Sequence, residues 1–148
     1  MPHCSQGCSQ QPARLYFEIS AEVKAIAPVV DAVTELARAE MGEESGVHLE
    51  VALALQEAMA NAVLHGCKHD ESKSIQCWVA YDRFRGITII VRDPGDGYDP
   101  NDLHDPCSEE NLHLTHGRGL FLIRALMDEV HFQNNGSEVH MRKANPAS

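Results

Sequence analysis

Three short segments that combine glycine with charged or amide side chains constrain this chain more than any other feature. They lie at residues 57–66 (EAMANAVLHG), 93–97 (DPGDG) and 117–120 (GRGL). The first lies in a helical pattern, the second follows an apolar strand pattern, and the third opens an apolar run. Each segment alone is weak evidence, but their occurrence in this order on a helix, a strand end and a helix start predicts a single shared site.

Size and charge bound the classes of protein that the chain can represent. Its 148 residues, of which 43% are hydrophobic, suit one domain with a real core. No apolar run is long enough to span a bilayer, and residues 1–11 lack the apolar segment of a secretion signal. The net charge of -10 disfavours broad binding to nucleic acids or anionic membranes, although backbone N–H groups and a metal ion can still hold phosphates. We therefore expect a cytoplasmic protein with no direct nucleic-acid or membrane contact.

Cysteine and histidine usage indicates a reducing compartment. The five cysteines are odd in number and scattered, unlike a disulfide framework: Cys4, Cys8, Cys67, Cys77 and Cys107. Two groups contain candidate metal ligands: His3, Cys4 and Cys8, and then His104, Cys107, His113 and His116. Because neither group has a standard zinc spacing, we interpret them as a loose terminus and a polar loop.

Apolar periodicity predicts an alternation of strands and helices. Strands are expected at residues 14–19, 74–81, 86–92, 129–132 and 138–143, and helices at 21–41, 46–65 and 119–127. Pro28 should perturb the first helix, Gly42 should end it, and Ser45 should cap the next. Short connectors at 82–85 and 134–136 predict two hairpins, and residues 94–116 predict a long loop.

This order of elements predicts an α+β fold with helices on one face of a mostly antiparallel sheet. Residues 1–12 are expected to form a flexible tail and residues 13–144 a single domain.

The first segment places Glu57 and Asn61 one turn apart on one helix face. The amide oxygen of Asn61 is a hard, neutral ligand suited to Mg²⁺, which is held mainly by phosphate oxygens and water. Glu57 can take a proton or orient a water molecule. The alternative is a solvated helix face, where such a pair is ordinary.

The second segment offers a means of selecting a nucleobase. A carboxylate at Asp93 can accept a hydrogen bond from the exocyclic amine of adenine, whereas guanine presents an oxygen there. Gly95 and Gly97 permit a close approach that a Cβ would block. The alternative is an ordinary turn, for which Asp96-Gly97 is a common dipeptide.

The third segment predicts a phosphate site. Gly117, Arg118 and Gly119 precede a predicted helix, whose first N–H groups are free to bind phosphate. The long loop before them could close over a nucleotide. The alternative is a flexible start to the helix.

Together these segments resemble the boxes of the GHKL ATPase superfamily, and Gly136-Ser137 resembles its last, glycine-containing box. Over residues 14–143 the chain is most similar to the short bacterial anti-sigma factor serine/threonine kinases. The resemblance implies a two-layer α/β sandwich of the Bergerat type with a long ATP lid. It also implies that ATP and Mg²⁺ are bound, with Asn61 at the metal, Glu57 as the catalytic base and Asp93 reading adenine. The remaining implied nucleotide contacts are Gly95, Gly97, Gly117, Arg118, Gly119, Leu120 and Ser137.

The resemblance further implies a partner-switching regulator. Such proteins phosphorylate a serine or threonine of a small anti-anti-sigma (STAS-type) protein, and many also sequester a sigma factor, usually as homodimers. Two alternatives stay open: an ATP-dependent regulator that binds a partner without phosphoryl transfer, and a detached histidine-kinase catalytic domain. The chain has no room for a separate dimerisation and phosphoacceptor domain, which disfavours the second alternative.

Overall fold

The computed structural model describes residues 13–95 and 115–146, and the predicted tail and most of the predicted lid lie outside them. These two ranges contain five strands: β1 (Ala13–Ser20), β2 (Ser74–Asp82), β3 (Gly86–Arg92), β4 (Glu129–Gln133) and β5 (Glu138–Lys143). The α-helices are α2 (Ile26–Met41), α3 (Val47–Asn61) and α4 (Thr115–Leu126). Short turns of other helical types occur at η1 (Val23–Ala25), η2 (Ala62–Gly66) and η5 (Asn134–Gly136).

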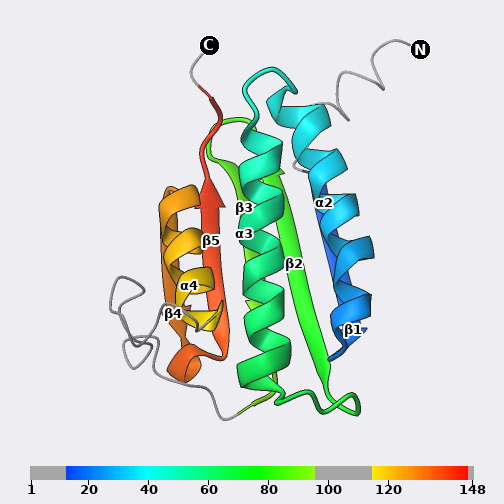
Figure 1. Cartoon of the computed structure of the whole chain (residues 1–148). Coiled ribbons are helices and arrows are strands. Elements are labelled where there is room, and N and C mark those ends of the chain that lie inside the picture. The colour runs from blue at the N-terminus through cyan, green and yellow to red at the C-terminus, as the bar shows by residue number, and fades with distance from the viewer. Residues whose placement is uncertain (1–12, 96–114, 147–148) are drawn as a thin grey trace, which may run out of the picture.

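The strands form one sheet in the order β1-β2-β3-β5-β4, and each neighbouring pair is antiparallel. Both predicted hairpins are present, and the pairing of Arg92 with Glu138 sets the end of β3 beside the start of β5. All three α-helices lie on the same face of the sheet (Figure 1). The predicted α+β, two-layer fold class is therefore confirmed.

The core lies between the sheet and the helices. The inward positions of the strands alternate as a half-buried sheet requires, with Ile75, Ile87, Ile89 and Met141 fully or almost fully buried. Burying such a side chain contributes about 1.5–3 kcal/mol. The apolar face predicted for the helix over 46–65 is buried throughout: Val51, Leu55, Ala58 and Met59 on α3, and Ala62 and Val63 on η2.

Helix α3 occupies the middle of the helical layer, where it packs against α2 on one side and α4 on the other (Figure 1). Its second predicted face, which carries Glu57, is therefore not a uniformly solvated surface, since Ala54 and Asn61 are also buried. This central position holds the C-terminal end of α3 firmly against the sheet.

The first half of the chain corrects two predicted helix boundaries. The α-helical part of α2 begins at Ile26, so Pro28 lies in its first turn, where a backbone N–H has no intrahelical partner to lose. Gly42 ends α2 with a φ of 87°, as predicted. The N-cap of α3 is Gly46, not Ser45, although the Ser45 hydroxyl accepts a hydrogen bond from the Val47 N–H at 3.3 Å.

Two further corrections concern the predicted site. The helix predicted over 46–65 is α-helical only to Asn61 and continues as a π-helical turn, η2, to Gly66. Helix α4 begins at Thr115, four residues before the predicted start. Residues 117–119 therefore lie within the first turns of α4 and not ahead of it.

In the ranges 13–95 and 115–146, we find no helix whose length and hydropathy would allow it to cross a membrane.

Candidate functional site

Two polar side chains face different environments near the end of α3. Asn61 is only 4% exposed, whereas Glu57, one turn earlier, is half-buried. Burial raises the pKa of the Glu57 carboxyl above its usual range. The burial of Asn61 contradicts the alternative of a solvated helix face for that residue, because an amide is rarely buried without a polar role.

The α3 helix widens directly after Asn61. In η2 the N–H of Cys67 donates to the carbonyl of Ala62 at 2.8 Å, which closes a π-helical turn. Such turns recur at functional sites because they displace the following residues from the regular helical path. Here the turn ends at Gly66, which is buried.

The Asp93 carboxyl is buried directly after β3, with only 5% of the residue exposed. Its backbone N–H donates to the carbonyl of Ser137 at 2.9 Å, and its Oδ1 accepts the Gly95 N–H at 2.8 Å. Burial raises the pKa of the Asp93 carboxyl, although the Gly95 N–H and the charge of Lys73 act in the opposite direction. Because burial disfavours its charged form, a carboxylate kept at this position is well suited to bind a polar ligand group.

Two glycines make the space in which this carboxylate lies. A Cβ added to Gly66 would lie 2.2 Å from both Cγ and Oδ2 of Asp93, far inside contact distance. A Cβ added to Gly95 would lie 2.0 Å from the carbonyl oxygen of Gly66. The first and second sequence segments are therefore in direct contact.

The third segment reaches the same region through α4, which packs against α3. Leu120 and Ile123 are buried on α4, and Met127 is buried directly after the helix ends. The first four N–H groups of a helix, counted from its N-cap residue, have no intrahelical partner, and in α4, which begins at Thr115, the last of these is the N–H of Gly117. The N–H groups of Arg118 and Gly119 fall within the hydrogen-bonded part of the helix, so of these three predicted phosphate-binding residues Gly117 alone offers a free helix-start N–H. Gly97 lies outside the described residues.

Ser137 lies between η5 and β5, beside Asp93. It is 7% exposed, and its hydroxyl donates to the Asn134 carbonyl at 2.9 Å. Its carbonyl oxygen holds the Asp93 backbone. The structure therefore brings Ser137 to the predicted site, where its observed contacts support the turn and the Asp93 backbone.

The residue that the sequence analysis did not assign to the site is Gly66. It was visible as the last residue of the first segment, but its contact with Asp93 depends on the π-helical turn, for which the sequence carries no clear signal. Burial raises the pKa of both the Asp93 carboxyl and the Cys67 thiol, and the charge of Lys73 opposes this rise at both groups.

A bound Mg²⁺ would need ligands beyond those of the protein. Within the ranges 13–95 and 115–146, no cluster of three or more His, Cys, Asp or Glu side chains could hold a metal ion. The two His- and Cys-containing groups noted in the sequence lie at positions whose side chains are outside the described residues. The buried amide of Asn61 fits a metal held chiefly by phosphate oxygens, because such a site uses only one or two protein ligands.

Comparison with known proteins agrees with this geometry. Residues 19–143 match the profile of the histidine kinase-like ATPase domain family. The chain is 38% identical over 104 residues to a serine-protein kinase RsbW of Bacillus licheniformis, covering 64% of this chain and 63% of that protein. It is 37% identical over 109 residues to a serine-protein kinase RsbW of Bacillus subtilis strain 168, covering 64% and 62% respectively. The matched region thus spans slightly less than two thirds of these relatives.

The buried charge of Asp93 predicts a pH-dependent effect of removing it. A carboxyl whose pKa is raised by folding binds its proton more tightly in the folded state, so its contribution to stability falls as pH rises through the raised pKa. Asp93→Asn should therefore raise the urea midpoint of the nucleotide-free protein at pH 7. The gain should shrink as pH approaches the ordinary carboxyl pKa of about 4.

Asp82→Asn is the matched control for this measurement. Asp82 also accepts a backbone hydrogen bond, from the Phe84 N–H at 2.7 Å, but it is not fully buried. It should give no gain in the urea midpoint at pH 7. A lower midpoint for Asp93→Asn at pH 7 would show that the Asp93 carboxylate stabilises the fold and would contradict its assignment as a ligand-binding group.

Proposed function

The chain belongs to the histidine kinase-like ATPase domain family, and we propose that it is an ATP-dependent protein serine/threonine kinase acting as an anti-sigma factor. The single observation that carries the proposal is the contact between Asp93 and the end of the helix that bears Glu57 and Asn61. The contact is made through Gly66, and in the proposal Asp93 reads the base, Asn61 binds the metal and Glu57 accepts the proton. The relatives named serine-protein kinases support phosphoryl transfer to a serine.

In this proposal Asp93 selects the nucleotide. Its Oδ1 is engaged by Gly95, and no described residue donates a hydrogen bond to Oδ2. Oδ2 can therefore accept the exocyclic amine of adenine, while the oxygen of guanine would face a carboxylate oxygen. In the proposal Gly95 and Gly97 allow the base to approach. Ser137 supports Asp93, because its carbonyl oxygen accepts a hydrogen bond from the Asp93 N–H.

The N-terminal turn of α4 would hold the phosphates. The free N–H of Gly117 and the positive end of the helix dipole attract anions, and Arg118 adds a positively charged residue to the same turn. Gly119 leaves room for the backbone to approach the nucleotide, and Leu120 anchors this turn in the core. These contacts bind and orient the nucleotide beside the end of α3.

Asn61 would contribute the protein ligand to Mg²⁺, which neutralises charge on the phosphates when it is bound. Glu57 would act as the base. It takes the proton of the substrate hydroxyl as that oxygen forms a bond to the γ-phosphorus and the bond from phosphorus to ADP breaks. The half-buried site suits this role, because a carboxyl with a raised pKa is a stronger proton acceptor.

The proposed phosphoacceptor is a serine or threonine of a small anti-anti-sigma (STAS-type) protein, and the proposed second partner is a sigma factor. The names of the relatives, serine-protein kinases, favour this class over a detached histidine-kinase domain. A regulator that binds ATP and a partner without phosphoryl transfer would use the same nucleotide site and is distinguished by the Glu57 experiment below.

We further propose that the protein forms a homodimer through the sheet face opposite the helices, which no described helix covers (Figure 1). The centre of this face is apolar. A pocket of about 370 Å³ there is lined by Tyr16, Trp78, Ala80 and Ile90 among others, and the Tyr16 and Trp78 rings lie 5.3 Å apart. Tyr16 is exposed and the other three are partly exposed, and solvent-accessible aromatic and aliphatic side chains of this kind are typical of interface centres.

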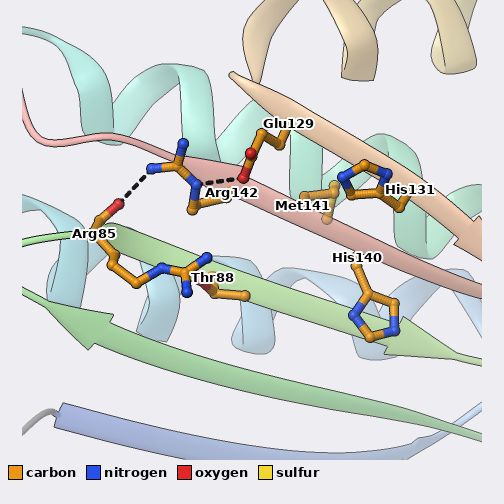
Figure 2. Close-up of a pocket in the computed structure, with 7 residues that line it drawn as sticks. All are labelled: Arg85, Thr88, Glu129, His131, His140, Met141 and Arg142. Atoms are coloured by element: carbon orange, nitrogen blue, oxygen red, sulfur yellow. Dashed lines mark hydrogen bonds and ion pairs between the residues drawn. The ribbon is translucent and has the colours of Figure 1, made fainter.

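The adjoining part of the same face is polar and internally paired. A second pocket, of about 280 Å³, shares Thr88 with the first and is bordered by Arg85, His131 and His140. Figure 2 shows how Arg142 is held there between the Glu129 carboxylate, at 2.5 Å, and the Arg85 carbonyl, at 2.7 Å. Because these charges are balanced, this face opposes association of two acidic chains less than an unpaired acidic surface would.

The role of Asn61 predicts a loss of metal dependence. Asn61→Ala should remove most of the enhancement of ATP affinity by Mg²⁺, because it deletes the proposed protein ligand, and calorimetric titration with and without Mg²⁺ measures this. Gln56→Ala removes an exposed amide from the same helix and serves as the control. An unchanged Mg²⁺ dependence in Asn61→Ala would place the metal ligand elsewhere.

The role of Glu57 separates a kinase from a binding protein. Glu57→Gln keeps the size of the side chain but cannot take the proton, so ATP binding should persist while phosphorylation of the anti-anti-sigma protein falls about 10²–10⁴-fold. Labelled ATP and the purified partner measure the transfer. Glu50→Gln, two turns earlier on α3 and 3.5 Å from Lys143, is the control and should retain activity.

Two results would change this assignment. Undiminished transfer by Glu57→Gln would remove Glu57 from the mechanism. Tight ATP-dependent partner binding by a wild-type protein that transfers no phosphate would identify a non-catalytic regulator.

The proposed dimer predicts that a charge on the open sheet face separates the protomers. Ile90→Glu places a carboxylate in the apolar pocket, so sedimentation equilibrium should show a dimeric wild type and a largely monomeric variant. Leu53→Glu changes a 40% exposed leucine on the outside of α3 and should leave the dimer intact. A monomeric wild type, or dissociation by Leu53→Glu alone, would contradict the use of the sheet face.

A further inference from the structure

Gly66 is the point where the helix carrying Asn61 touches the proposed adenine-reading carboxylate. The residue is buried, and it is not among the glycines with positive φ, which are Gly42, Gly46, Gly86 and Gly136. Its backbone conformation is therefore open to other residues. What requires glycine here is space, because a Cβ would lie 2.2 Å from Cγ, 2.2 Å from Oδ2 and 2.4 Å from Oδ1 of Asp93.

The close distances to all three atoms show that the whole carboxyl group lies against the Cα of Gly66. Two other contacts fix the same group. The Ser137 carbonyl accepts the Asp93 N–H, and the Gly95 N–H donates to Oδ1. Gly95 is itself confined, since its Cβ would lie 2.0 Å from the Gly66 carbonyl oxygen and 2.9 Å from Oδ1. The orientation of the Asp93 carboxyl thus depends on Gly66, Gly95 and Ser137 together.

From this packing we propose that Gly66 is a positioning residue for nucleotide selection: the absence of a side chain lets the Asp93 carboxyl lie against the end of α3, oriented to receive adenine. The inference rests on the proposed ATP-binding function. The π-helical turn contributes to this positioning, because it connects Asn61 to Gly66, the residue that contacts Asp93. One rigid segment thereby sets the spacing between the proposed metal ligand and the adenine reader.

The effect of a methyl group at this position follows from the geometry. In Gly66→Ala the carboxyl must rotate or move away from α3, and its hydrogen bond to adenine is lost or weakened. GTP gains nothing from the original orientation, so its weaker binding should change little. The selectivity for ATP over GTP should therefore fall, which a purely structural role for Gly66 would not cause.

A double-mutant cycle tests the proposal. ATP and GTP dissociation constants are measured by calorimetry with Mg²⁺ for the wild type, Gly66→Ala, Asp93→Ala and the double variant. Gly66→Ala should weaken ATP binding at least about tenfold, the order expected for a hydrogen bond to a charged group. In the Asp93→Ala background the same substitution should change ATP affinity by less than about twofold, because the group it displaces is gone.

Gly42→Ala controls for lost stability. Gly42 has a φ of 87° and no atom within 4 Å of its would-be Cβ, so alanine there strains the backbone without touching Asp93. It should lower the melting temperature without altering ATP selectivity. If Gly66→Ala does not fold, recovery of a cooperative melt in the double variant reports the same contact with Asp93.

The outcomes separate this inference from the proposed function. If the wild type fails to bind ATP, the proposed function is wrong. If the wild type selects ATP and Asp93→Ala loses that selectivity while Gly66→Ala keeps it, the function stands and the role of Gly66 is overturned. An equal loss caused by Gly66→Ala with and without the Asp93 carboxyl would also overturn it, as would failure of the double variant to fold when the single variant does not.

Discussion

The contact of the Asp93 carboxyl with Gly66, at the end of the π-helical turn that continues α3, is the interaction on which the rest of the proposed site depends. Helix α3 is central in its layer and packed on both sides, so its C-terminal end has a fixed place above the sheet. The pairing of β3 with β5 brings Ser137 to the Asp93 backbone. A buried carboxyl, a buried amide and the start of α4 are thereby collected at one corner, although they come from distant parts of the chain.

This arrangement costs stability in the absence of a ligand. Burial disfavours the charged form of Asp93, and only one backbone N–H from the described residues compensates it directly. A fold selected for stability alone would place an uncharged residue there. This loss of stability is consistent with a site in which the nucleotide supplies the polar partner of Asp93. Burial also raises the pKa of the half-buried Glu57 carboxyl, which makes it a better proton acceptor.

Much of the fold could be predicted because its signals are local. The Ile- and Val-rich run at 86–92 and the turn at 134–136 located β3 and β5 to the residue, and the predicted apolar stripe of the central helix matched the buried set. The errors arose where local signals compete or are absent. Gly117 and Gly119 are weak helix formers, which placed the predicted start of α4 too late, and nothing in residues 62–66 distinguishes a π-helical turn from an α-helical one. The contact of Gly66 with Asp93 is a tertiary consequence of that turn and could be found only in the structure.

The central claim is that a buried carboxylate at Asp93 reads adenine. Calorimetric titration of the wild-type protein with ATP and with GTP, each with Mg²⁺, tests it most directly. The account predicts that ATP binds about 10²-fold more tightly or better, because guanine leaves the buried carboxylate facing an oxygen instead of an amine. Equal affinities for the two nucleotides, or no binding of ATP, would contradict it.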